Sequence, residues 1–293
     1  MSPHPAWAAR RRRVERLRGE HPPAAELLAF YGDILALQEP LYAKAQGPRW
    51  LNAVETGDGS PRLRLTRLPE RPRERAFARF VRAVPASATD LLRAVAGRLS
   101  AEPAATSALL GAALEGRSPG AVAASLDCEE AALEFFPRAF LQPVAEALVA
   151  AMPGPAPGPA GDVGDPGPGD AGPRAACPCC GAAPVAAVLR DLPEARGRRT
   201  LLCSLCLTEW GFPRMRCPAC GEERPERRPH HVSESWPHVR LEECGSCRVY
   251  VKAIDLREAG LAVPVVDELA SVELDLWAAE QGLSKLRTNL LGL

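Results

Sequence analysis

The sequence predicts an α+β protein in which an N-terminal helical domain precedes two tandem four-cysteine units and a C-terminal helix. Three observations support this prediction: helical spacing of apolar residues over the first half, four Cys-x-x-Cys pairs after residue 176, and an amphipathic stretch near the end. The expected boundaries are 1–151 for the helical domain, 152–174 for a linker, 175–214 and 215–257 for the two cysteine units, and 258–293 for the C-terminal helix and tail.

The first half has the pattern of a helical bundle. Leu28, Tyr31 and Leu35 recur at spacings of three and four, which places them on one helix face. Pro22 and Pro23 interrupt this pattern, because proline disrupts helix interiors. Helices that pack their apolar stripes together are expected. Further helices are predicted over residues 88–100, 104–115, 129–136 and 140–151.

The segment 152–174 has the composition of a spacer. It is dominated by proline and glycine and carries almost no large apolar side chain. Such a chain cannot offset its ordering entropy by burial, so we expect a flexible or extended linker.

Eight cysteines form an internal repeat. The string Cys177-Pro178-Cys179-Cys180-Gly181 returns 40 residues later as Cys217-Pro218-Ala219-Cys220-Gly221. The gaps that separate the pairs within each copy are 22 and 23 residues long. The predicted metal ligands are Cys177, Cys180, Cys203 and Cys206 in the first unit and Cys217, Cys220, Cys244 and Cys247 in the second.

This spacing is typical of rubredoxin and zinc-ribbon metal sites. Two residues between cysteines let both sulfurs reach one ion at about 2.3 Å. Gly181 and Gly221 suit the positive φ of the turn that follows. The long gap suits a hairpin that returns a second pair opposite the first, and the metal is expected to supply much of the folding free energy of so small a unit. Head-to-tail grouping is the primary hypothesis, and an interleaved cross-brace of the pairs is the alternative.

The remaining cysteines and the nearby histidines are not expected to bind metal. Cys179 is interpreted as a bystander within the first pair, and Cys128 as a core residue of the helical domain. His230, His231 and His238 are expected at strand or surface positions, because four thiolates already complete each site. A closed thiolate shell indicates a non-catalytic metal, and tetrahedral sulfur accepts iron or zinc.

A final helix is predicted from Pro264 to Gln281. Val265, Leu269 and Leu276 lie on one face of it, and Gly282 suits its end.

The composition and the N-terminus indicate the cellular setting. Lys+Arg and Asp+Glu number 36 each, so the formal charge is zero and a nucleic-acid partner is not expected. The apolar runs are too short for a transmembrane helix, so membrane insertion is not expected, and Arg10–Arg13 are not followed by the apolar core of a secretory signal. We therefore expect a cytoplasmic protein, in which paired cysteines favour metal over disulfides.

The motifs resemble the formate dehydrogenase accessory proteins, the FdhE family. The resemblance rests on strings around the cysteine pairs and before the last helix, with a weaker one in the opening helix. They are Cys177–Val185, Leu202–Trp210, Arg216–Gly221, Glu243–Lys252, Pro264–Asp275 and Arg13–Tyr31.

The resemblance implies a non-enzymatic maturation factor that binds the catalytic subunit of a formate dehydrogenase in the cytoplasm. It also implies rubredoxin-like iron, with zinc as the alternative, at two ions per chain. Two other hypotheses remain: a zinc-ribbon module for protein or nucleic-acid interaction, and a rubredoxin-like electron carrier.

Overall fold

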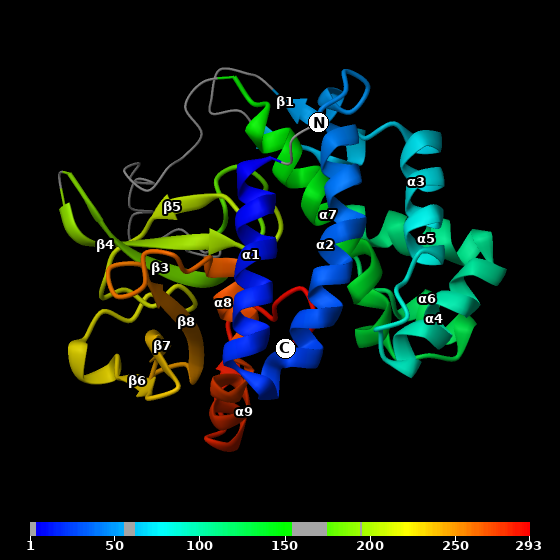
Figure 1. Cartoon of the computed structure of the whole chain (residues 1–293). Coiled ribbons are helices and arrows are strands. Elements are labelled where there is room, and N and C mark those ends of the chain that lie inside the picture. The colour runs from blue at the N-terminus through cyan, green and yellow to red at the C-terminus, as the bar shows by residue number, and fades with distance from the viewer. Residues whose placement is uncertain (1–3, 56–61, 154–174, 194) are drawn as a thin grey trace. The chain divides into compact units, whose positions relative to one another are not determined.

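The structure, a computed structural model, describes residues 4–55, 62–153, 175–193 and 195–293 (Figure 1). The segment expected as a linker lies outside these residues from position 154 onward. Contacts divide the chain into two compact units: one runs from Glu26 to Pro153, and the other joins the N-terminal residues up to Ala25 with the cysteine-containing part. The first helix was expected within the helical domain, but its contacts group it with the cysteine unit.

Helices dominate the unit from Glu26 to Pro153, as predicted, with one small hairpin of β1 and β2. Thr89 caps α4 by accepting a hydrogen bond from the Leu92 amide at 3.3 Å, so the helix begins at Asp90, two residues after the predicted start. The elements are α2 (Ala25–Ala45), β1 (Val54–Glu55), β2 (Arg62–Leu63), α3 (Glu70–Arg82), α4 (Asp90–Ala101), α5 (Pro103–Leu114), α6 (Gly120–Leu126) and α7 (Glu130–Ala150).

Helix α7 is a single helix, so the prediction of two helices over residues 129–151 was wrong. The predicted break fell at residues 137–139, but the helix runs through both Pro137 and Pro143. Pro143 has no amide to donate to the carbonyl of Ala139. The side chain of Gln38 in α2 donates to that carbonyl at 2.8 Å instead. A side chain distant in sequence therefore satisfies the group that proline leaves unpaired, and local pattern cannot show this.

The core of this unit is aromatic. Phe140 packs against Phe77 and Phe80 with ring centroids 5.2 and 6.0 Å apart, and Phe30 lies 5.6 Å from Phe135. Cys128 is a half-buried residue in the turn after α6 rather than a helical core residue, because Asp127 adopts a left-handed conformation that ends the helix.

The cysteine unit contains one sheet with strand order β5-β4-β3-β8-β7-β6, and β9 also pairs with β8. Each of the two predicted hairpins is present, as β3–β4 and β6–β7. Parallel pairing of β3 with β8 joins them, which the sequence did not predict. The elements are α1 (Pro5–Glu20), β3 (Pro184–Leu192), β4 (Ala195–Cys203), β5 (Glu209–Gly211), β6 (His230–Ser233), β7 (Trp236–Glu243), β8 (Val249–Asp255), α8 (Pro264–Ala270), α9 (Val272–Glu280) and β9 (Ser284–Lys285).

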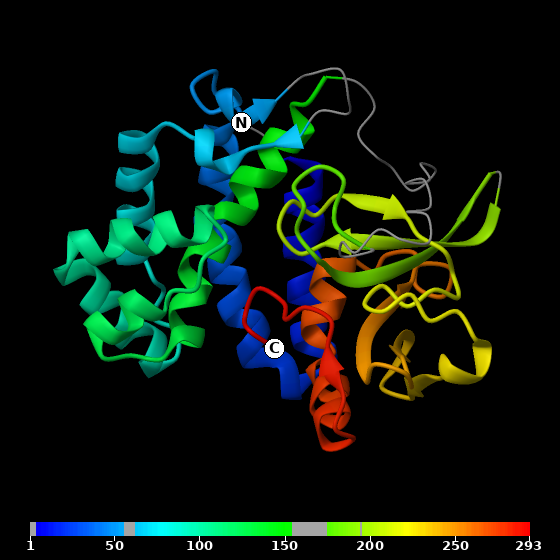
Figure 2. The same cartoon turned by 180° about the vertical axis from the view of Figure 1, so that it is seen from behind.

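Helix α8 contacts both the sheet, at β3 and β8, and α1 (Figures 1 and 2). The predicted helix over residues 264–281 is divided at Ser271, so the prediction of one continuous helix was wrong. The ammonium of Lys252, wholly buried in β8, donates to the carbonyls of Glu268 and Ser271 at the end of α8. A helix C-terminus attracts a cation, so this lysine stabilises the end of α8.

Two carboxylates compensate the charge of Lys252. Asp275 accepts from its ammonium at 2.7 Å, and Glu268 lies 3.2 Å away. Lys285 completes the group by donating to both carboxylates at 2.5 and 2.9 Å. Buried charges are tolerated when they are paired in this way, so the network fixes α8 and α9 on the sheet.

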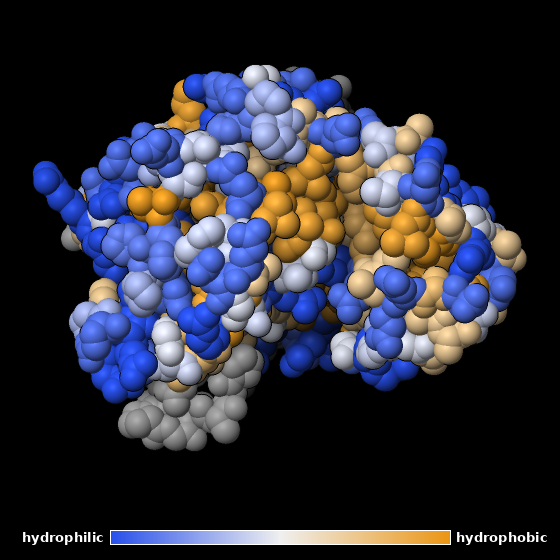
Figure 3. All heavy atoms as spheres, turned by 90° about the horizontal axis from the view of Figure 1, so that it is seen from below, coloured by the Kyte–Doolittle hydropathy of each residue, from blue (hydrophilic) through white to orange (hydrophobic). Residues whose placement is uncertain are grey.

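Apolar side chains fill the interiors of both units, and hydrophilic side chains cover much of the face seen in Figure 3. None of the helices in the described part of the chain combines the length and the apolarity that a membrane crossing requires.

Candidate metal centres

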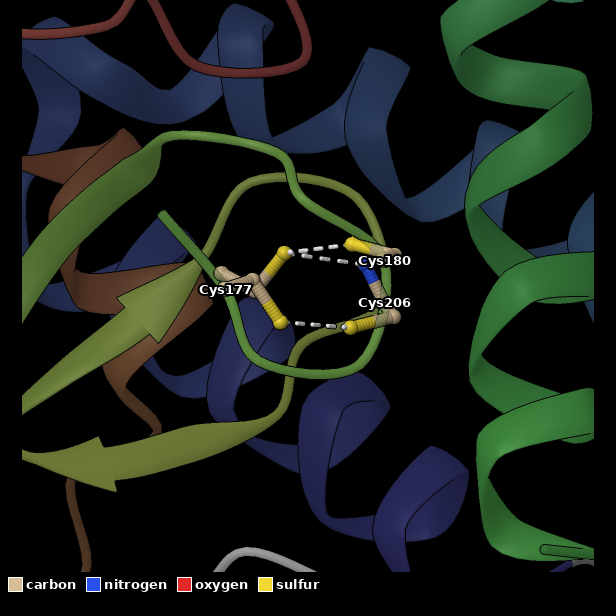
Figure 4. Close-up of side chains that lie close together, drawn as sticks. Cys177, Cys180 and Cys206 are labelled. Carbon is tan, nitrogen blue, oxygen red and sulfur yellow. Dashed lines mark hydrogen bonds between the residues drawn. The ribbon is translucent and has the colours of Figure 1, made fainter. Parts of the chain in front are cut away.

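The first cluster brings together the four cysteines of the first unit. The sulfurs of Cys177 and Cys206 lie 3.5 Å apart, and those of Cys180 and Cys203 lie 3.3 Å apart. Ligands about 2.3 Å from one tetrahedral ion lie about 3.8 Å from each other, so this spacing fits one metal ion. Figure 4 shows the side chains of Cys177, Cys180 and Cys206 pointing toward one another.

The second cluster has the same arrangement. The sulfurs of Cys217 and Cys247 are 3.8 Å apart, and those of Cys220 and Cys244 are 3.6 Å apart. The structure therefore groups the cysteine pairs head to tail, first with second and third with fourth, rather than as a cross-brace. Neither cluster, as the described residues form it, contains a histidine.

The backbone conformation after the cysteine pairs is the same in the two units, just as their sequences are similar. The residue directly after each cysteine pair has a positive φ in all four Cys-x-x-Cys turns, or knuckles. Gly181 and Gly221 follow the first pair of each unit with φ of 76° and 81° and donate to the carbonyls of Cys177 and Cys217 at 2.8 and 3.0 Å. Leu207 and Arg248 follow the second pairs with φ of 56° and 59°.

Only two of these four turns have a sequence signature. Glycine adopts positive φ without steric cost, so the prediction of a turn at Gly181 and Gly221 is confirmed. Leu207 and Arg248 carry a Cβ in the same region, which costs roughly 1–2 kcal/mol each. The surrounding knuckle must stabilise these two turns, and residue type alone does not reveal them.

Hydrogen bonds favour the thiolate form at one cysteine of each cluster. Cys179, Cys180 and Cys203 donate to Cys177 and lower its pKa to about 5. Burial of Cys244 acts to raise its pKa, but hydrogen bonds with the backbone of Cys247 and Ser246 bring the pKa down to about 7. The thiolate is the form that binds metal, so both environments suit a ligand.

The two clusters differ in exposure. Three sulfur-bearing residues of the first are buried and Cys180 is half-buried. In the second, Cys217 and Cys244 are buried, but Cys247 is half-buried and Cys220 is exposed. Solvent and chelators therefore have easier access to the second centre.

Cys179 lies beside the first cluster without belonging to it. It is 3% exposed, and its hydrogen bond to Cys177 together with burial raises its pKa well above the usual range. A thiol that stays protonated donates a hydrogen bond to a ligand sulfur, which agrees with its interpretation as a bystander.

The three histidines serve other parts of the cysteine unit. His238 contacts Asp267 in α8 at 2.7 Å, and Arg13 in α1 binds the same carboxylate. His231 contacts Glu243 at 2.9 Å, whereas His230 is exposed on β6. These positions agree with the expectation of strand and surface histidines.

The fold and the two clusters define a class: a helical unit combined with a tandem pair of four-cysteine ribbons. Residues 176–214 match the family model described as FdhE, central domain, and residues 215–291 match the model of the FdhE C-terminal domain. Residues 176–291 of this chain therefore match two FdhE domains, which confirms the resemblance found in the sequence.

Individual relatives match over the same region. A protein of Aquifex aeolicus named Protein FdhE homolog is 40% identical over 116 residues, which cover 40% of this chain and 41% of the relative. A homolog of the same name from Stutzerimonas stutzeri is 36% identical over 115 residues, or 39% and 37% of the two chains. The match thus spans about two fifths of the length of these curated relatives.

The fold is similar over nearly the whole chain to a solved structure. The crystal structure of the FdhE protein from Pseudomonas aeruginosa superposes with a TM-score of 0.63 at 24% identity and covers 97% of this chain and 95% of that one. This similarity confirms the predicted α+β fold with its N-terminal helical part.

Proposed function

We propose that the chain is a non-enzymatic accessory factor that binds the catalytic subunit of a formate dehydrogenase during its maturation. The observation that carries this proposal is the match of both cysteine units to FdhE domains, because all eight clustered cysteines fall within residues 176–291. The cytoplasm is the proposed site of action, as the family resemblance implies.

Each cluster is proposed to hold one metal ion through four thiolates. Such a shell has no open position for water or substrate, which supports a role in shaping the protein rather than in hydrolysis. Rubredoxin-type iron is the proposed metal and zinc is the alternative, because sulfur ligands in a tetrahedron suit both. When iron is bound, such a centre can carry one electron.

A gene deletion tests the maturation role. Deletion in the native host should abolish formate dehydrogenase activity while the transcript and the catalytic subunit polypeptide remain. The intact gene should restore activity, and so should a Cys128→Ser variant, because Cys128 lies outside both clusters. Full activity in the deletion strain would exclude the maturation role and favour a zinc-ribbon interaction module.

The exposure of Cys220 supports electron transfer as a second candidate function. A ligand at the surface brings the metal within reach of a redox partner. Anaerobically purified protein should then contain iron and show a reversible one-electron couple. Zinc at both centres of protein purified from the native host would eliminate the electron carrier.

A further inference from the structure

The sheet carries a second candidate site away from the sulfur clusters. A pocket of about 220 Å³ opens beside β6 and β7 and lies wholly within the cysteine unit. Three of the six side chains that line it are arginines and one is a carboxylate: Arg214, Met215, Arg228, His230, Arg240 and Glu242.

The strand register places this pocket on one face of the sheet. Arg240 and Glu242 alternate along β7 with Leu241, which pairs with Lys252 of β8. Because Lys252 points to α8 and α9, Arg240 and Glu242 point to the opposite face. The pocket is therefore separated from the helices by the sheet itself.

More than one arginine side chain surrounds the carboxylate of Glu242. Arg199 donates to its Oε2 at 2.8 Å, Arg228 lies 4.0 Å from the same atom, and Arg240 lies 3.4 Å from Oε1. Arg214 adds a further guanidinium at the pocket wall. Three guanidinium groups thus lie within 4.0 Å of this one carboxylate, and a fourth lines the pocket.

The pKa of Asp255 is lowered chiefly by its hydrogen bond with Arg257, and only to a smaller extent by the charge of Arg240. Arg257 binds this carboxylate through two nitrogens at 2.8 and 2.5 Å. The pocket therefore retains positive charge after the ion pairs of the described residues are counted.

Two of the arginines also keep an unused donor. The Nε atoms of Arg228 and Arg240 are buried and have no hydrogen-bond partner among the described residues. The side chain of Arg228 is only 6% exposed. A buried N–H without an acceptor costs free energy, so the described residues do not fully satisfy these two arginines of the pocket lining.

We propose that this pocket binds an oxyanion, either a phosphate or a carboxylate group. Guanidinium groups present paired donors that match the oxygens of both groups. Met215, 43% exposed at the wall, offers an apolar contact to the organic part of such a ligand. This inference goes beyond the proposed function and does not depend on the identity of a client protein.

Calorimetric titration of the full metal-loaded chain tests the proposal, with inorganic phosphate and sodium acetate as the two probes at low ionic strength. At least one probe should bind saturably, and the stronger one identifies the oxyanion class. Arg214→Gln and Arg240→Gln should weaken that binding at least tenfold, which corresponds to about 1.4 kcal/mol.

Arg227→Gln is the matched control. Arg227 precedes Arg228 in the same loop and carries the same charge, but it is exposed and does not line the pocket. Its variant should bind like the wild type. Arg214 is exposed, so Arg214→Gln decides the question even if Arg240→Gln does not fold. The proposal is overturned if neither probe binds saturably, or if Arg214→Gln binds as tightly as Arg227→Gln.

Discussion

At the scale of single residues, Asp267 holds together three elements of the cysteine unit. Its side chain is fully buried and accepts from Arg13 in α1 at 2.5 Å and from the Val263 amide at 2.8 Å. His238 of β7 lies 2.7 Å from the same carboxylate. Asp267 thus links α1, α8 and the sheet.

Asp267→Asn should destabilise the cysteine unit by about 3 kcal/mol at pH 7, because it leaves the buried Arg13 without its counter-charge. Denaturant unfolding of the metal-loaded protein measures the loss. Asp90→Asn is the control, because Asp90 is 94% exposed and its pair with Arg93 should contribute less than about 1 kcal/mol. Equal losses in the two variants would contradict the role assigned to Asp267.

Asp267 also makes the unfolding free energy of the cysteine unit depend on pH. Burial acts to raise the pKa of Asp267, but hydrogen bonds with His238 and Arg13 outweigh burial and hold the pKa below its usual range. A carboxyl with a lowered folded-state pKa stabilises the protein above its unfolded pKa of about 3.9, and this stabilisation is lost as the pH falls through the folded-state value. The difference in unfolding free energy between wild type and Asp267→Asn should therefore shrink below about pH 4. A difference that stays constant down to pH 3 would count against this linkage.

Trp210 follows the second cysteine pair and is buried in β5. It is 1% exposed, so it packs in the core, and its neighbour Glu209 is bound by Arg190 at 2.5 Å. Trp210→Ala should cost about 3–5 kcal/mol and lower the melting temperature, while Trp210→Phe should recover much of the loss. An unchanged melting temperature would instead indicate a contact residue for a partner.

At the scale of elements, the two ribbons should release metal at different rates. Cys220 is exposed, whereas each cysteine of the first ribbon is at least half-buried. A colorimetric chelator should therefore remove one ion in a fast phase and the other in a slow phase. Cys217→Ser combined with Cys220→Ser should abolish the fast phase, and Cys177→Ser combined with Cys180→Ser the slow one.

Elemental analysis gives the control for this experiment. Each double variant should retain one ion per chain, and Cys128→Ser should retain two, because Cys128 lies outside the clusters. A single phase in the wild type, or the loss of the slow phase in the second-ribbon variant, would contradict the assignment of the phases.

The sequence pattern predicted the elements that are determined by residues close together in the sequence. Cysteine spacing and the glycines at 181 and 221 identified the ribbons and their hairpins because a metal knuckle depends on neighbours in sequence. The end of α8 at Ser271 is stabilised by Lys252, which is distant in sequence. The left-handed turns of non-glycine residues and the parallel β3–β8 pairing likewise have no local signature.

At the scale of the whole molecule, composition predicted a helical part followed by a cysteine part. It did not predict that α1 belongs with the second of these. The apolar residues of α1 repeat as they do in any surface helix, and tertiary contacts such as the ion pair of Arg13 with Asp267 reveal where α1 packs. The unit against which a helix packs is determined by tertiary contacts, so the periodicity of the helix sequence cannot predict it.

Affinity capture of the tagged full-length chain from its native host tests the central claim most directly. The catalytic subunit of a formate dehydrogenase should co-purify with the wild-type chain and with Cys128→Ser, as identified by mass spectrometry. Capture should fall in the Cys217→Ser/Cys220→Ser variant if the second metal shapes the binding surface. Recovery of metal-loaded, folded chain without any dehydrogenase subunit, from cells that express the enzyme, would contradict the proposed function.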